Sequence, residues 1–343
     1  MDSPFLIRSC REDDLEGLFR LAQQVYFINL PADREVISEK IRLSMASFNG
    51  DIEDKFEREY ILVMESLEEG NVIVGTSGII ARHGSAAVPH MYFELKELQK
   101  YSETIHSGFI HKVLRLRFDY DGPTEIGGLV VNPTYRSHKA KLGRQLSFSR
   151  FLYMKMRRRW FKNHVLSELM PPLTEQGESI LWEAVGRKFT NLSYQEADVL
   201  SRKNKEFVTS LFPKGDIFTC LLDGEVRDSI GRVGPGAEPV KHMLEKIGFQ
   251  WREHIDPFDG GPHYLAETDK ITLVKETQKR KISRETLKRK VKDMALVATT
   301  SGGDFKCIQT PYEVVRHKVS LPKATIEALG TEAGDAVYLT PVT

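Results

Sequence analysis

Residues 124–133 read Thr-Glu-Ile-Gly-Gly-Leu-Val-Val-Asn-Pro, and after a short polar turn residues 144–161 run without glycine or proline. The strand-forming composition up to Val131, followed by Asn132-Pro133, predicts a strand that stops at the turn. Glycines weaken a strand interior, so we expect the Gly127-Gly128 pair to serve a bulge or the close approach of a ligand. Apolar side chains spread around the second run, which predicts a largely buried helix.

The turn between this strand and this helix is rich in cations. The first N–H groups of a helix lack intrahelical partners and lie at the positive end of its dipole, so they favour anions. We therefore expect a pyrophosphate to bind at Gly143, with Arg136 and Arg144 beside it. An ordinary surface loop is the alternative. The other basic residues of the turn are His138, Lys139 and Lys141.

This strand, turn and helix resemble the coenzyme A-binding element of the GCN5-related N-acetyltransferases. In that superfamily the strand carries the acyl-thioester arm, and an Arg-x-x-Gly-x-Gly/Ala turn follows it. The match is partial, because only Gly143 stands where a loop glycine is expected, and Ala140 and Lys141 occupy the region of the other. The residues that this resemblance assigns to acyl-CoA binding are Val131, Arg136, Gly143 and Arg144.

The composition is that of a soluble globular protein. Of the 343 residues, 41% are hydrophobic and 28% are charged, and the net charge of +1 does not favour nucleic acid as a partner. Apolar runs are too short to span a membrane, and Met1-Asp2-Ser3-Pro4 lacks the features of a secretory signal. We therefore expect a cytoplasmic protein with no membrane and no nucleic-acid partner. Both a homo-oligomer and a hetero-oligomer are compatible with the sequence.

The spacing of potential ligands does not indicate metal or disulfide chemistry. Cys10, Cys220 and Cys307 are few, odd in number and far apart, so they suggest neither a disulfide framework nor a zinc knuckle. The ten histidines show no metal-ligand spacing along the chain. We therefore expect no metal.

The remainder of the chain alternates helical and strand patterns, which predicts an α/β fold. Leu114, Leu116 and Phe118 alternate with arginines, as in a half-buried strand. The expected architecture is a mixed sheet flanked by helices, similar to the acetyltransferases named above, with a small β-rich C-terminal appendage. Further predicted elements are helices over Ser179–Phe189 and Glu238–Ile247 and strands over Val165–Met170, Glu206–Leu211 and Ile217–Leu222.

A basic stretch is the best candidate for a domain boundary. Residues 275–292 hold nine Lys or Arg against two Glu, a local charge of +7, which is typical of a solvated helix face or a linker. We therefore expect an acyltransferase-like domain over residues 1–270, a basic linker or helix over residues 271–293 and a small β-rich segment over residues 294–343.

Blocks over nearly the whole chain resemble the bacterial arginine N-succinyltransferases. The most specific block is Ile255-Asp-Pro-Phe-Asp-Gly-Gly-Pro262, which an unrelated globular sequence would rarely supply. The resemblance implies an acyltransferase fold, succinyl-CoA as the donor, the α-amino group of arginine as the acceptor, and Leu129 in contact with the acyl-CoA. Other blocks in family order are Val74-Gly75-Thr76, Leu129-Val130-Val131-Asn132-Pro133, Ser149-Arg150-Phe151, Trp182-Glu183-Ala184 and Ala333-Gly334-Asp335.

Four segments depart from the pattern of that family. Residues 26–31, Tyr-Phe-Ile-Asn-Leu-Pro, replace a Gly-rich Thr-Ser-Leu-Pro region, and Ser210 replaces a glutamate. The proposed catalytic histidine of the family follows an Ile-Gly-Gln-Val run, whereas here Gly234 follows Ile230-Gly231-Arg232-Val233. A family Met-Arg-Gly segment is replaced by Leu169-Met170-Pro171. These departures leave a second hypothesis, which is a member that binds acyl-CoA or an amino acid as a sensor or interaction protein, or that acylates a different amine.

Three residues are candidates for catalysis. Glu125 begins the central strand, where a carboxylate could take the proton of the amine directly or through water; a structural hydrogen bond or salt bridge is equally compatible. Glu168 lies on an apolar strand, where an unpaired buried carboxylate is costly, so it is paired, edge-exposed or functional. His254 lies near the Gly234 position in sequence and is a candidate to replace the missing histidine, with surface exposure as the alternative.

Two aspartates are candidates for binding the acceptor. A guanidinium pairs bidentately with a carboxylate, so Asp256 and Asp259 could hold arginine or a related amine. The alternative is that both aspartates form the turn before Gly260-Gly261.

Overall fold

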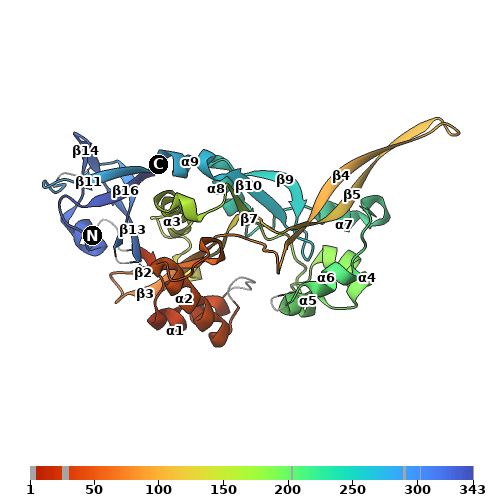
Figure 1. Ribbon diagram of the computed structural model, residues 1–343, viewed down its shortest axis with the longest axis horizontal. Helices are drawn as coiled ribbons and strands as arrows, with labels where there is room; N and C mark the ends of the chain where they lie inside the picture. The colour runs from red at the N-terminus through yellow and green to blue at the C-terminus, as the bar shows by residue number, and fades with distance from the viewer. Residues whose placement is uncertain (1–4, 25–30, 202–203, 289–290, 302, 343) are drawn as a thin grey trace. The chain divides into compact units, whose positions relative to one another are not determined.

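The protein consists of two compact units, and both mix helices and strands (Figure 1). The computed structural model describes residues 5–24, 31–201, 204–288, 291–301 and 303–342. Unit 1 comprises Met1–Arg82, Thr124–Asn163 and Glu267–Thr343, and unit 2 comprises His83–Pro123 and His164–Ala266. Each unit is therefore assembled from segments that are distant in sequence. Among the described residues no helix is long and apolar enough to cross a membrane.

The central sheet of unit 1 contains the strand predicted at residues 124–131. Its elements in chain order are β1 Phe5–Ser9, α1 Leu15–Gln23, α2 Arg34–Asn49, β2 Glu59–Ser66, β3 Val72–Ile80, β6 Thr124–Val131 and α3 Leu142–Met156. β6 pairs antiparallel with β3, β3 with β2, and β2 with β1. Helix α2 packs on β2, and α3 packs on β3 and β6. The predicted sheet flanked by helices is confirmed.

Helix α2 shows how local sequence sets the boundaries of these elements. Asp33 precedes the helix, and its carboxylate accepts hydrogen bonds from two first-turn N–H groups at 2.9 and 3.2 Å. Gly50 ends the helix with a left-handed φ of +88°. Between them, Ile37, Ile41 and Phe48 are buried, so the apolar face of α2 covers the sheet.

The C-terminal segment of unit 1 is β-rich, as the sequence predicts. Its elements are α9 Thr272–Glu276, β11 Gln278–Ile282, β12 Met294–Ser301, β13 Asp304–Pro311, β14 Glu313–Val315, β15 Lys318–Ser320, α10 Lys323–Leu329 and β16 Ala336–Val342. β13 pairs antiparallel with β12 and with β1, which joins this segment to the central sheet. β11 pairs antiparallel with β16 and parallel with β15, so the sheet is mixed.

The basic stretch differs from the linker or helix that its composition predicts. Within residues 271–293, helix α9 ends at Glu276 and residues 278–282 form strand β11. Most side chains of β11 are exposed, and only Ile282 is fully buried, which explains the polar composition of the strand. Its backbone is held by ladders to β16 and β15, which local composition does not encode.

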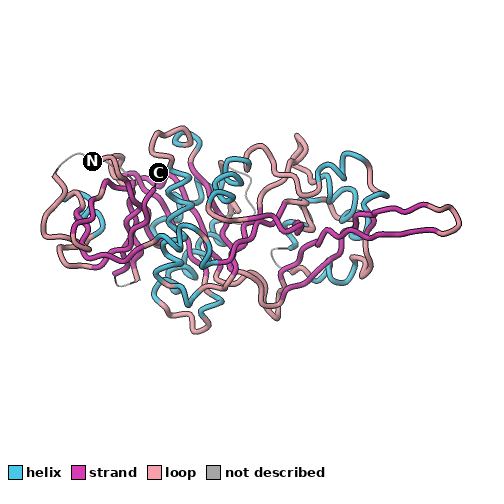
Figure 2. Tube along the Cα trace, turned by 90° about the horizontal axis from the view of Figure 1, so that it is seen from above, coloured by secondary structure: helices cyan, strands magenta, loops and turns pink. Residues whose placement is uncertain are grey.

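Unit 2 contains a long antiparallel ribbon made of β4 His90–Ser102 and β5 Ser107–Asp119 (Figure 1, Figure 2). The pairing is continuous from His90↔Asp119 to Ser102↔Ser107. The other elements are β7 His164–Glu168, α4 Arg187–Thr190, α5 Tyr194–Ser201, α6 Glu206–Leu211, β8 Ile217–Phe218, α7 Gly224–Ser229, α8 Glu238–Lys246, β9 Gln250–Ile255 and β10 Pro262–Glu267. β9 pairs antiparallel with both β4 and β10, so the first residues of the ribbon are anchored in a sheet.

The core of unit 2 surrounds Trp182. The indole stacks on Phe258 with ring centroids 5.2 Å apart and planes 7° apart. Gly186 packs directly against the indole, since a Cβ at that position would lie 2.3 Å from the ring. The helix predicted over Ser179–Phe189 is present, with a π-helical turn over Trp182–Gly186.

Two strand predictions in unit 2 are wrong. Glu206–Leu211 forms α6, because Val208 and Phe212, four residues apart, are buried together as on one face of a helix. Within Ile217–Leu222 only β8 is a strand, and a 3-10 turn follows it. The β-branched and aromatic composition favoured strands, but packing into the core decides the local conformation.

Candidate active site

Strand β6 leads through a structured turn into helix α3. The Asn132 side chain accepts a hydrogen bond from the N–H of Thr134 at 3.1 Å, which stabilises a 3-10 turn over Pro133–Tyr135. Lys141 has a left-handed φ of +54° immediately before α3. In the described structure the Lys141 side chain makes no capping hydrogen bond to the first turn of α3, and anion binding at this helix end stays a prediction. The predicted central helix is present and largely buried, but it ends at Met156 and not at Phe161.

The residues predicted to bind pyrophosphate all lie on this turn. Arg136 is exposed, and its Nε donates to the carbonyl oxygen of Val131 at 3.2 Å. Gly143 and Arg144 lie in the first turn of α3 and are half-buried. A Cβ on Gly143 would make only an ordinary contact of 3.8 Å with the Val131 side chain. Packing within the protein therefore does not require glycine at position 143.

Strand β6 carries a β-bulge at its paired glycines. The register with β3 passes from Gly78↔Gly127 to Thr76↔Val130, so in the described ladder Gly128 and Leu129 have no partner residue on β3. Gly128 has a φ of +61°, which glycine adopts without strain. Of the two roles predicted for the glycines, the bulge is confirmed. The backbone of residues 128–129 is thereby left outside the ladder.

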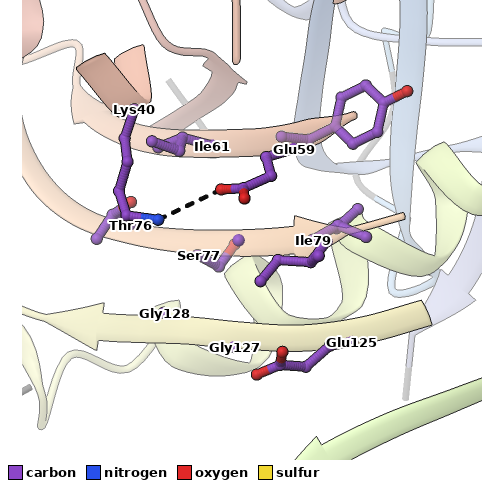
Figure 3. Close-up of a pocket in the computed structure, with 12 residues that line it drawn as sticks. Lys40, Glu59, Ile61, Thr76, Ser77, Ile79, Glu125, Gly127 and Gly128 are labelled. Atoms are coloured by element: carbon purple, nitrogen blue, oxygen red, sulfur yellow. Dashed lines mark hydrogen bonds and ion pairs between the residues drawn. The ribbon is translucent and has the colours of Figure 1, made fainter. Parts of the chain in front are cut away.

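A pocket lies on β2, β3 and β6 beside this bulge (Figure 3). It holds about 500 Å³ of empty space, including the part that opens to solvent. Lys40 of α2 and Glu59 of β2 form an ion pair of 3.3 Å at its wall. Glu125, the predicted base, lines the same pocket from β6 and is 3% exposed. The further lining residues are Tyr60, Ile61, Thr76, Ser77, Gly78, Ile79, Ile80, Gly127 and Gly128.

Arg150 is a positioning residue for which sequence analysis assigns no role. Its side chain is buried, and its Nη1 donates to the carbonyl oxygen of Gly127 at 3.3 Å. Its Nε and Nη2 donate to the carbonyl and hydroxyl oxygens of Ser147 at 3.1 and 2.7 Å. Burial lowers the pKa of Arg150 to about 9, so it stays a cation at neutral pH. The sequence feature that could have indicated this role is an arginine placed among the apolar residues of a helix. Its bonds tie α3 to the bulged part of β6.

In unit 2, Glu168 at the end of β7 lies among histidines. Its Oε1 is 3.4 Å from Nε2 of His263, 4.0 Å from Nε2 of His83 and 4.0 Å from Nδ1 of His90. His90 and His263 are buried, and desolvation of the imidazolium lowers the pKa of each well below its ordinary value. Glu168 is thus surrounded by polar groups, which agrees with the paired or functional alternatives of the sequence prediction.

His254 is half-buried and packs against Tyr92, with ring centroids 4.3 Å apart and the ring planes tilted by 33°. The Tyr92 ring also stacks on His90, with centroids 5.3 Å apart. Burial lowers the pKa of His254, so its imidazole favours the neutral form. His254 therefore belongs to the same aromatic group as the histidines around Glu168.

Asp256 and Asp259 shape the turn that precedes β10. Oδ1 of Asp256 accepts hydrogen bonds from the N–H groups of Phe258 at 2.7 Å and Asp259 at 3.1 Å. Oδ1 of Asp259 accepts from the N–H of Gly261 at 2.7 Å. Burial raises the pKa of Asp259, and the charge of Asp256 adds to that shift. The turn-forming alternative is present in the structure, and a role in holding the acceptor stays a prediction.

Two of the departures from the family pattern, Gly234 and the Leu169-Met170-Pro171 segment, contact each other in unit 2, whereas residues 26–30 of a third lie outside the described residues. The N–H of Gly234 donates to the carbonyl oxygen of Met170 at 2.8 Å. A Cβ at position 234 would lie 2.6 Å from the carbonyl oxygen of Pro171, closer than real Cβ contacts allow. A histidine at position 234 is therefore incompatible with this backbone.

The predicted site residues form two groups. Those in unit 1 are Glu125, Leu129, Val131, Arg136, Gly143 and Arg144, and those in unit 2 are Glu168, His254, Asp256 and Asp259. Sequence analysis missed His83, His90 and His263, because they come from three separate segments and local spacing does not connect them.

Comparison with known proteins identifies the family. Residues 5–273 match the family described as arginine N-succinyltransferase beta subunit, and residues 278–341 match the C-terminal domain of that subunit. The arginine N-succinyltransferases of Shigella dysenteriae serotype 1 and Escherichia coli (strain K12 / DH10B) are each 29% identical over 339 residues, which cover 97% of this chain and 96% of those proteins.

A solved structure is similar over the same length. It is the arginine/ornithine succinyltransferase subunit AI from Pseudomonas aeruginosa, which is 27% identical and superposes with a TM-score of 0.85. The match covers 99% of each chain, so it includes both groups of site residues and the β-rich segment. The family matches and this structural likeness agree: the chain belongs to the arginine N-succinyltransferase family.

Proposed function

We propose that this protein transfers the succinyl group of succinyl-CoA to the α-amino group of arginine. The observation that carries the proposal is the relationship over 97% of the chain to proteins named arginine N-succinyltransferase. The same relationship supports a place for the reaction in arginine catabolism in the cytoplasm. The donor is assigned to strand β6, the turn that follows it and helix α3.

The donor side of the reaction is assigned to the turn before α3. The charges of Arg136 and Arg144 and the helix end at Gly143 suit the pyrophosphate of coenzyme A. The backbone of residues 128–129, which lies outside the ladder to β3, can pair with the amide groups of the acyl-pantetheine arm. This arrangement would place Leu129 and Val131 beside the arm.

The chemistry requires a neutral amine, a polarised thioester carbonyl and a proton for the leaving thiolate. The amine nitrogen bonds to the carbonyl carbon, the carbon–sulfur bond breaks, and the nitrogen gives up a proton. Glu125, buried at the pocket wall, is assigned to accept that proton directly or through water. A general base contributes about 10²–10⁴-fold, and positioning supplies much of the remaining rate.

Asp256 and Asp259 stay the candidates for binding the acceptor, as the sequence predicts. Asp256 and Asp259 carry carboxylates that suit a guanidinium, and each keeps a second oxygen besides the Oδ1 that bonds the turn. His254 is half-buried and favours the neutral form, as a proton acceptor must. Glu168 is a further candidate for proton transfer. The family's proposed histidine is absent at Gly234, so its role must be met by another group.

The chain is further proposed to work within an oligomer. The matching family is described as a beta subunit, and the similar solved structure is named a subunit. Multi-angle light scattering on the purified protein tests this proposal, since a monomer at all concentrations would contradict it.

The proposed activity is tested by free-thiol release from succinyl-CoA and acetyl-CoA with a panel of amines headed by arginine and ornithine. Release that depends on both succinyl-CoA and arginine is the expected result. Calorimetry with coenzyme A accompanies each assay, so that failure to bind the donor is distinguished from failure to turn over. Coenzyme A binding without thiol release for any amine would contradict the proposed transferase activity and would support a non-catalytic binding protein.

A further inference from the structure

We propose that His83, His90 and Glu168 of unit 2 bind a divalent transition-metal ion, with zinc as the best-fitting ion. Metal binding at this site needs no acyl-CoA, and it would give Glu168, named above as a candidate for proton transfer, the role of a ligand. Two observations support the metal site: the spacing of the ligand atoms, and the buried imidazole nitrogens that lack hydrogen-bond partners in the described structure.

The ligand atoms have separations close to those of a metal site. One ligand atom from each of His83, His90 and Glu168 lies within 4.8 Å of the other two. Oε1 of Glu168 is 4.0 Å from Nε2 of His83 and 4.0 Å from Nδ1 of His90. In a tetrahedral zinc site with bonds of about 2.0–2.1 Å, neighbouring ligand atoms are about 3.3 Å apart. Small side-chain rotations would therefore close the three ligands on one ion.

Buried nitrogens point to a missing ligand. Nδ1 of His90 and both ring nitrogens of His263 have no hydrogen-bond partner in the described structure. The two residues are only 4% and 0% exposed, so bulk water does not supply the missing bonds. Buried polar atoms in native proteins are nearly always satisfied, and a metal ion would satisfy Nδ1 of His90 directly.

The spacing of Glu168 from His83 and from His90 is not that of a direct hydrogen bond. Oε1 of Glu168 is 4.0 Å from the nearest nitrogens of His83 and His90, beyond the range of a hydrogen bond. Three imidazoles surround this one oxygen, and the rings of His83 and His90 have centroids 4.5 Å apart. Convergence of lone-pair donors on one point is what a cation requires.

The donor set indicates the class of ion. Two imidazoles and one carboxylate form a nitrogen–oxygen set without thiolate, which suits zinc and related first-row divalent ions more than magnesium or calcium. A set with three protein ligands leaves a coordination position for water. The bound ion would connect the loop at His83, the start of β4 and the end of β7.

His263 lies beside this set. Its Nε2 is 3.4 Å from the same Glu168 oxygen, and Glu168, Asp256 and His263 form a second group of ligand atoms within 4.8 Å of one another. Oδ1 of Asp256 already accepts two backbone hydrogen bonds. We therefore assign the ion to His83, His90 and Glu168, with His263 as the adjoining residue.

The test is metal binding by the untagged full-length protein, without acyl-CoA. The metal-free chain is titrated with zinc in a calorimeter, and cobalt is added in parallel because its visible absorption reports tetrahedral coordination. The expected result is one zinc per chain, a cobalt spectrum of tetrahedral type and a raised melting temperature when zinc is present. Retention of neither ion by folded protein would overturn the proposal.

Variants assign the ligands. The double variant H83A/H90A is expected to weaken zinc binding by more than about 100-fold, beyond the 10–100-fold cost of losing an outer-shell partner. E168Q, which keeps the shape of the side chain, tests the carboxylate if the double variant fails to fold. H242A is the matched control, because the side chain of His242 is 65% exposed, and it should bind zinc as the parent does. Equal binding by the parent and by both E168Q and H83A/H90A would overturn the assignment, as would zinc loss in H263A alone.

Discussion

At the scale of single residues, Gly143 is the position whose role the sequence indicates best. Sequence analysis places it on a basic turn, and the structure adds that a Cβ there has room. Gly143→Glu should weaken acyl-CoA binding at least about tenfold, about 1.4 kcal/mol, through steric and charge conflict with the pyrophosphate. Gly143→Ala should leave the melting temperature unchanged. Isothermal calorimetry with coenzyme A measures both variants, and unchanged affinity in Gly143→Glu would remove the anion site from this turn.

Glu125 is assigned a chemical role, so its replacement should affect turnover more than binding. Glu125→Gln keeps the shape of a buried side chain and should lower kcat by at least about 100-fold with little change in KM for succinyl-CoA. Glu59→Gln is the control, because Glu59 lines the same pocket but pairs with Lys40. Steady-state kinetics of both variants measure kcat and KM for succinyl-CoA. An equal loss of kcat and of donor affinity in Glu125→Gln would make Glu125 structural.

Gly234 is explained by contact with the backbone. Gly234→His restores the family residue but forces a Cβ to within 2.6 Å of the carbonyl oxygen of Pro171. We expect a loss of about 1–3 kcal/mol in the free energy of unfolding, as for overpacked sites. Gly236→Ala is the control, because nothing lies within 4 Å of a Cβ at that position. Urea unfolding curves measure both, and a Gly234→His protein as stable as Gly236→Ala would contradict the packing argument.

The residue scale also shows where sequence reasoning stops. Asp256 and Asp259 precede Gly260-Gly261, and that local pattern was enough to indicate their turn bonds. His83 and His263 are 180 positions apart, and only the fold brings both near Glu168. Local patterns therefore find residues that act on their neighbours, and tertiary structure is needed for the rest.

At the scale of elements, the bulge in β6 is expected to affect both the stability of the protein and its binding of acyl-CoA. Gly128→Ala should cost about 1–2 kcal/mol of stability, because its φ of +61° is unfavourable for a side chain. It should also weaken acyl-CoA binding by displacing the backbone of residues 128–129. Gly50→Ala, at a φ of +88° in open space after α2, carries a comparable strain away from β6. Denaturation and calorimetry on the pair separate strain from binding, and equal donor affinity in the two variants would argue against the bulge as part of the site.

Elements with a strong local pattern were predicted, and those held by tertiary pairing were not. β6 and α3 follow from composition, turn residues and length. β11 reads as a basic linker, because its side chains face solvent and its ladders to β16 and β15 come from distant segments. α6 was taken for a strand, because its six residues are too few to show a helical period.

At the scale of the whole molecule, two units are each built from discontinuous segments. A division by sequence alone into residues 1–270, 271–293 and 294–343 cannot represent that interleaving, and these boundaries stay a prediction. The family relationship was recognisable from ordered sequence blocks, because such blocks persist where single site residues change. Gly234 and Met170-Pro171 are the example, since they depart from the family pattern and contact each other here.

The central claim is succinyl transfer to arginine, and product analysis tests it most directly. The protein is incubated with succinyl-CoA and arginine carrying ¹⁵N at the α-amino group, and the products are fragmented in a mass spectrometer. The account predicts a succinylated arginine whose succinyl group is attached to the labelled nitrogen, with one coenzyme A released for each product. Protein that binds coenzyme A but yields no succinylated arginine, or yields one modified on the guanidinium, would contradict the account.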